Sequence, residues 1–110
     1  MRRAHTDSPP TLDAVAVLGL RIAAARRERR WTAVELADRA GVSLNTLRNV
    51  ERGAPTVAVG VVFELATLLG IELFGADSTQ LPDLVSRHQD RLALLPARVR
   101  TPHEPVDDDF

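Results

Sequence analysis

The sequence predicts an all-α protein, and three observations lead to this prediction. Apolar residues recur at spacings of three and four along most of the chain, as they do on one face of a helix. Residues that begin or end helices separate these stretches, among them Thr32, Gly41, Ser43 and Gly53. No segment alternates apolar and polar residues over the length of a strand. With 110 residues, the chain has room for one small domain and flanking tails.

The first helix is predicted directly after a loose N-terminal segment. Residues 1–10 have no apolar periodicity and end in two prolines, so we expect a flexible N-terminal arm there. Thr11 is expected to cap a helix that ends near Arg30. The apolar positions of this helix are Leu12, Val15, Leu18, Ile22 and Ala25. Trp31 follows directly and is expected to anchor the core.

Two short helices follow. Thr32 and Glu35 have the spacing of a capping box, in which each side chain bonds the backbone amide of the other residue. This predicts a second helix that stops at Gly41, a residue type that tolerates a left-handed turn. Ser43 is expected to cap a third helix that runs through Glu51.

The remaining elements are two helices and a tail. Residues 58–69 are almost uncharged and predict a fourth, central helix, which completes a domain of residues 11–80. Its expected inner stripe is Val59, Val62, Phe63, Ala66 and Leu69. Residues 81–95 predict a fifth helix with an apolar stripe of Leu84, Val85, His88, Leu92 and Leu95. We expect this stripe to form a homodimer, with the terminal arms as the alternative. Residues 96–110 hold three prolines and no apolar periodicity, which predicts a disordered acidic tail.

Charge is distributed unevenly. Residues 18–52 hold eight arginines against four acids, or +4, and residues 53–110 hold four arginines against nine acids, or −5. A basic segment favours a polyanionic partner, and an acidic segment favours a partner of a different kind. A solvated surface that binds no partner explains the charges equally well. A run of four arginines stands at the C-terminal end of the first predicted helix: Arg26, Arg27, Arg29 and Arg30. These positive charges either stabilise the negative end of the helix dipole or contact phosphate.

Residues 32–53 carry the main functional prediction. Two short helices around a glycine turn bury the apolar residues that they share, which is the geometry of a helix-turn-helix. These residues are Leu36, Ala37, Ala40, Val42, Leu47 and Val50. The second helix then presents Leu44, Asn45, Arg48 and Asn49 outward, and the major groove of DNA is wide enough to admit it. An ordinary helical hairpin is the alternative.

At these positions the chain resembles the Xre, or Cro/repressor-like, helix-turn-helix family. The resemblance covers about residues 18–74 and rests on the motifs at residues 35–37, 41–43 and 51–53. It implies a five-helix λ-repressor-like fold that binds a palindromic DNA operator as a dimer. It implies base contacts by Leu44, Asn45, Arg48 and Asn49, and phosphate contacts by Thr32, Thr46 and Arg52. Arg48 suits phosphate as well, and Ala33 stands where the family often has glutamine.

A narrower resemblance is to the HipB-like antitoxins, through residues 51–60, 68–70 and 91–100 and the terminal sequence VDDDF. It implies a repressor of its own operon that also neutralises a HipA-like serine/threonine kinase toxin. An acidic cluster that ends in an aromatic residue suits a basic groove, so the expected partner-binding residues are Asp107, Asp108, Asp109 and Phe110. The alternatives are a solubilising tail, a stand-alone Xre-type regulator, and a protein-interaction module that does not bind DNA.

Other classes of function find little support. The chain has no cysteine and three isolated histidines, so we expect no disulfide, metal or cofactor. It has no glycine-rich phosphate loop and no nucleophile–base pair, so we do not expect an enzyme. The apolar run of residues 14–20 is too short to span a membrane, and we expect a cytoplasmic protein that joins the nucleoid when it is bound to its operator.

Overall fold

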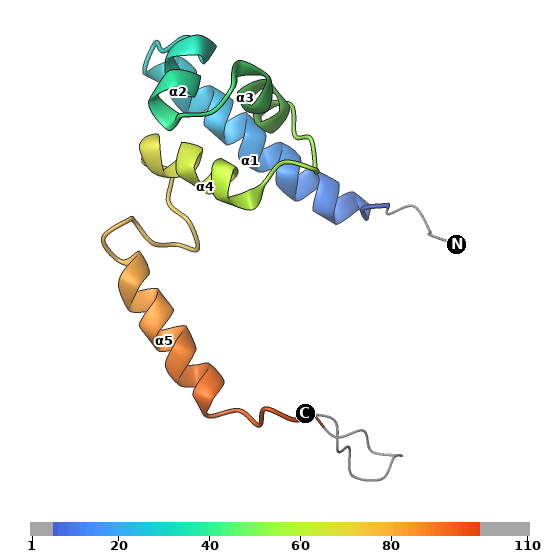
Figure 1. Ribbon diagram of the computed structural model, residues 1–110, viewed down its shortest axis with the longest axis vertical. Coiled ribbons are helices and arrows are strands. Elements are labelled where there is room, and N and C mark those ends of the chain that lie inside the picture. The colour runs from blue at the N-terminus through green and yellow to red at the C-terminus, as the bar shows by residue number, and fades with distance from the viewer. Residues whose placement is uncertain (1–5, 100–110) are drawn as a thin grey trace. The chain divides into compact units, whose positions relative to one another are not determined.

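The computed structural model describes residues 6–99, and Figure 1 shows its helices in chain order. The predicted acidic tail from residue 100 onward, with the proposed partner-binding residues Asp107, Asp108, Asp109 and Phe110, lies outside the described residues. The described part holds five helices: α1 (Pro9–Glu28), α2 (Ala33–Ala40), α3 (Leu44–Glu51), α4 (Val59–Leu68) and α5 (Leu81–Ala93). Its only β-type pairing is an isolated bridge between Leu73 and Ala76, so the all-α prediction is confirmed.

The chain divides into two compact units. The first ends at Ser78 and contains α1 to α4, and the second begins at Thr79 and contains α5. Within the first unit, α3 packs against both α1 and α2, and α2 also contacts α4. Figure 1 shows α2 and α3 beside the longer α1. The buried apolar side chains come from all four helices and from the residue that caps α4, so one core holds the unit together: Ile22, Leu36, Ala37, Leu47, Val50, Val62, Leu65 and Leu69.

Helix α1 begins at Pro9, three residues before the start that a Thr11 cap predicts. Ser8 is its N-cap residue, and a proline occupies the first helical position. The expected loose arm therefore does not extend to residue 10, and Thr11 is not the cap. The physical reason is that proline has a fixed φ near the helical value, and the N–H that it lacks has no partner in the first turn of a helix.

The buried face of helix α4 agrees only in part with its prediction. Val62, Ala66 and Leu69 are buried, as predicted. Val59 is also predicted on the inner stripe, but it is 65% exposed, and Leu65, which the prediction leaves out, is fully buried. Val59 is the first residue of the helix and lies beyond the core. A helix that is apolar on every face gives no clear indication of which face is buried. The central position predicted for α4 is not observed, because α2 and α3 each pack closely against two helices and α4 packs closely against α2.

Helix α5 starts where predicted but ends at Ala93 rather than at residue 95. Of its predicted apolar stripe, Leu84 is half-buried and the other members are exposed: Val85, His88, Leu92 and Leu95. No residue of this helix is buried. It is therefore an amphipathic helix whose apolar stripe is mostly exposed.

Candidate nucleic-acid interface

The turn between α2 and α3 has the geometry predicted for a helix-turn-helix. Gly41 ends α2 in the left-handed conformation with φ of +70°, where a side chain would be strained. Ser43 begins α3, and its Oγ accepts a hydrogen bond of 3.0 Å from the backbone amide of Thr46. Leu36, Leu47 and other apolar residues of the two helices are buried against each other in the core. The predicted helix boundaries at this turn are confirmed.

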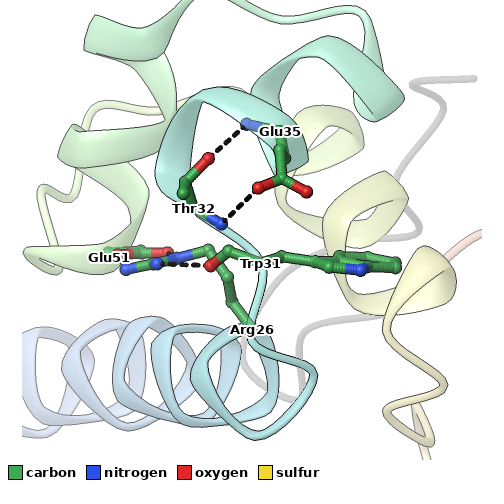
Figure 2. A network of polar contacts seen from close by, with 5 residues as sticks. All are labelled: Arg26, Trp31, Thr32, Glu35 and Glu51. Carbon is green, nitrogen blue, oxygen red and sulfur yellow. Dashed lines mark hydrogen bonds and ion pairs between the residues drawn. The ribbon is translucent and has the colours of Figure 1, made fainter.

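The N-terminus of α2 is closed by the predicted capping box. The Thr32 hydroxyl accepts from the Glu35 amide at 3.1 Å, and the Thr32 amide donates to Oε1 of Glu35 at 3.3 Å, as Figure 2 shows. The hydroxyl proton of Thr32 remains available as a donor, and the residue is exposed.

A bidentate ion pair ties the end of α1 to the end of α3. The Arg26 guanidinium donates to both carboxylate oxygens of Glu51, at 2.7 and 3.0 Å, and also to the Trp31 carbonyl at 3.0 Å (Figure 2). The two side chains are only 12% and 14% exposed. The hydrogen bond to Glu51 is the main reason why the pKa of Arg26 lies above its ordinary value. Arg26 therefore has a structural role and does not belong to the surface that could contact phosphate.

Three of the predicted base-facing residues, Asn45, Arg48 and Asn49, lie on the side of α3 that points away from Leu47 and Val50, and Leu44 lies at the edge of that side. Asn45 and Arg48 are exposed, whereas Leu44 and Asn49 are half-buried. The side-chain oxygen of Asn49 accepts a hydrogen bond from the Arg52 guanidinium one turn later. Its amide N–H groups have no partner among the described residues and can donate outward.

The predicted phosphate-facing residues lie at the helix ends. Thr46 is half-buried, and its hydroxyl oxygen accepts from Ser43 Oγ at 2.8 Å, which leaves its proton free to donate. Arg52 is exposed at the C-terminal end of α3. Thr32 lies at the N-terminus of α2, where the helix dipole favours an anion. All three side chains thus have donors that can reach solvent.

The arginine run at the end of α1 is divided between different environments. Arg29 stacks on the Trp31 ring at 5.6 Å from its centroid, and Arg39 of α2 lies 4.2 Å from the same centroid. Trp31 is itself half-buried and packs against the core, as predicted. Arg27, by contrast, lies on the α1 surface that faces Arg48 and Arg52 of α3. The run thus does not act as one cationic patch.

Elsewhere in the same unit lies a hollow that is apolar, unlike the arginine-rich surface between α1 and α3. It has a volume of about 220 Å³ and is lined by uncharged residues of α1, α3, α4 and the segment between α3 and α4. The lining residues are Val15, Leu18, Gly19, Val50, Pro55, Val57, Val59, Val62 and Phe63. It offers no charge to a polyanion, so the surface that is suited to phosphate lies elsewhere, around α3.

The sequence interpretation missed two features that hold α3 in place. Gly19 of α1 is buried, and a Cβ there would collide with the Val50 carbonyl oxygen and lie 3.1 Å from that of Glu51. The one indication in the sequence is a glycine inside an apolar helical run. The pair of Arg26 and Glu51, 25 positions apart, follows no local spacing rule and has no such indication.

Comparison with known proteins supports the predicted motif. Residues 22–75, which contain α2, α3 and α4, match the family model described as "Helix-turn-helix". Searches of curated proteins and of solved structures found no match. Within residues 6–99, no helix is both long enough and apolar enough to cross a membrane, and no three potential metal ligands gather. The first unit thus contains a helix-turn-helix domain whose helices fit a λ-repressor-like fold.

Proposed function

We propose that this protein is a sequence-specific DNA-binding transcriptional repressor that inserts α3 into the major groove. One observation carries the proposal: α3 buries Leu47 and Val50 and presents Asn45 and Arg48 to solvent. A helix held by one face with polar residues on the other is the usual element of major-groove recognition. The match of residues 22–75 to a helix-turn-helix family is typical of DNA-binding regulators and supports the same proposal.

The chemistry of the predicted contact residues suggests which of them bind bases and which bind phosphate. Adenine presents a hydrogen-bond donor and an acceptor in the major groove, and an asparagine side chain has the complementary acceptor and donor. This suits Asn45 and Asn49 to contact adenine. Leu44 suits the methyl group of thymine. Thr32, Thr46 and Arg52 suit phosphate, because hydroxyl and guanidinium groups donate to its oxygens. Phosphate contacts position the protein, and base contacts supply the specificity.

The test begins with a duplex site selected by the protein from a random library. Asn45→Ala or Asn49→Ala should weaken binding to that site by about 1–3 kcal/mol and leave binding to random duplex nearly unchanged. Arg52→Ala should weaken both about equally and flatten the dependence on salt, because fewer counterions are released. Equal losses on both duplexes for the asparagine variants would show that another element enters the groove.

We also propose that the protein binds a palindromic operator as a homodimer through α5. The exposed Val85, Leu92 and Leu95 support this, because an apolar stripe of this length is seldom left in water. Leu92→Asp should give monomers in sedimentation experiments without loss of helix content. Ser86→Asp, an equal charge on the polar side of α5, is the matched control and should stay dimeric. A Leu92→Asp protein that remains dimeric would place the interface in the terminal arms.

The finer proposal, an antitoxin that represses its own operon and neutralises a HipA-like kinase toxin, rests on the sequence resemblance. It assigns partner binding to the last four residues, Asp107, Asp108, Asp109 and Phe110, which lie outside the described residues. Deletion of these residues should leave DNA affinity unchanged and weaken neutralisation of a co-expressed kinase encoded beside this gene. Full neutralisation by the truncated protein would contradict the role of the tail.

Ala33, at the position where glutamine is frequent in the resembled family, favours a second candidate function. This is a protein-interaction module that keeps the helix-turn-helix fold without binding DNA. Failure of the wild-type protein to bind any duplex at low salt would support this candidate over the repressor.

A further inference from the structure

A shallow depression lies between α1 and α3, on the surface away from the apolar hollow. Leu20, Ala23, Ala24 and Arg27 of α1 line it on one side, and Arg48, Glu51 and Arg52 of α3 line it on the other. Ala23 and Ala24 have short side chains, which hollows the surface between the longer arginines. Two helices that are distant in sequence thus bring three arginines to one place.

The one carboxylate in this depression is already neutralised. Glu51 receives two hydrogen bonds from Arg26, which approaches from the core side, so its charge does not oppose the three arginines. No ion pair joins Arg27 or Arg48 to a carboxylate within residues 6–99. Arg52 contacts the neutral side chain of Asn49. Three arginines therefore line one hollow and have no acidic partner within residues 6–99, which makes the hollow suited to an anion.

The position of the depression on α3 identifies the kind of anion. Arg48 and Arg52 are four positions apart and form one flank of the helix, next to the row that holds Asn45 and Asn49. A helix with its side chains is about 10–12 Å wide, and the major groove is about 12 Å wide. When the asparagine row faces the bases, the flanks of α3 therefore lie against the phosphate strands that border the groove.

We propose that this depression binds phosphodiester groups of one DNA strand, with Arg27 of α1 as a phosphate ligand beside Arg48 and Arg52. The inference rests on the proposed DNA-binding function and extends it to α1, a helix outside the helix-turn-helix pair. It also assigns Arg48 to phosphate rather than to a base. The pair of Arg26 and Glu51 then has a positioning role, because it holds α1 beside α3 and cancels the acidic charge.

Arg27→Gln tests the proposal, with Arg21→Gln as its matched control. Arg21 is also exposed on α1 but does not line the depression, so both variants lose one charge from the same helix. Arg27→Gln should weaken binding to the selected site and to random duplex by the same factor, about fivefold to tenfold at 0.1 M salt. The slope of log K against log salt should fall by about 0.9, the value of one phosphate contact, while Arg21→Gln keeps the wild-type slope.

Two further variants sharpen the result. Arg27→Lys keeps a positive charge and should keep the wild-type slope. Arg48→Gln should weaken the selected and random duplexes equally, whereas loss on the selected site alone would make Arg48 a base contact and overturn its assignment. The fluorescence of Trp31, the only tryptophan of the chain, reports whether each variant is folded.

The outcomes separate this inference from the function on which it rests. If the wild-type protein binds duplex DNA and Arg27→Gln behaves like Arg21→Gln, the phosphate site is wrong and the repressor proposal stands. If the wild-type protein binds no duplex even at 50 mM salt, a concentration at which non-specific contacts are strong, both proposals fail.

Discussion

Helix α3 has two neighbours, and it is joined to them in different ways. Its contact with α2 depends on residues that are close in sequence: the left-handed Gly41, the Ser43 cap and the capping box at Thr32. Its contact with α1 depends on residues 25 or more positions apart, the ion pair of Arg26 with Glu51 and the close approach of Gly19 to Val50. The difference shows that residues close in sequence determine the α2–α3 motif itself. The packing of this motif against α1 depends instead on residues that are distant in sequence.

The two contacts should also differ in how much change they tolerate. The caps of α2 and α3 are exposed hydrogen bonds, each worth about 1 kcal/mol. At Gly19 the backbone of α1 lies directly against carbonyl groups of α3, so there is no flexible side chain to move aside. We therefore expect the largest losses of stability at the contact with α1.

The largest effect is expected for Gly19→Ala. The added methyl group would collide with the Val50 carbonyl, so α1 and α3 must move apart, at a cost of about 2–3 kcal/mol. Urea unfolding followed by Trp31 fluorescence measures this loss. An unchanged free energy of unfolding would mean that the two helices do not approach as closely as described.

The next largest effect is expected for Glu51→Gln. The change removes one of the two charge-assisted hydrogen bonds of the nearly buried Arg26 guanidinium, which should cost about 2 kcal/mol. A double-mutant cycle with Arg26→Met isolates the coupling between the two side chains. Additive effects of the two substitutions would show that the ion pair contributes nothing to the contact between α1 and α3.

A smaller effect is expected at the contact with α2. Thr32→Ala removes the cap of α2 and should lower the free energy of unfolding by about 1 kcal/mol. Thr32→Ser keeps the hydroxyl group and is the control, with a loss of only a few tenths of a kcal/mol expected. A loss as large as that for Gly19→Ala would contradict the proposed difference between the two contacts.

The smallest effect, and one of opposite sign, is expected for Gly60→Ala in α4. Like Gly19, this glycine is helical and its φ is not positive, but no atom lies within 4 Å of an added Cβ. The substitution should stabilise the protein by about 0.5 kcal/mol, because alanine loses less backbone freedom on folding. Since Gly19→Ala makes the same chemical change, the pair separates steric collision from helix propensity.

Several parts of the fold and of the candidate site could be predicted from the sequence alone. The boundaries of α2 and α3, the capping box and the turn at Gly41 all follow from hydrogen bonds within a few residues. The buried positions Leu36, Leu47 and Val50 follow from helical periodicity. The exposed positions of Asn45 and Arg48 follow from the same periodicity, because they lie on the opposite side of α3.

Only the tertiary structure decided which residues of different helices meet. Periodicity within one helix does not show which helix lies beside it, so the sequence left Arg26 and Arg27 as equal members of one arginine run. The packing of α1 on α3 places Arg26 inside, against Glu51, and Arg27 outside, beside Arg48 and Arg52. The same packing brings Gly19 directly against the Val50 carbonyl, because the distance between helix backbones depends on atoms that are far apart in the chain.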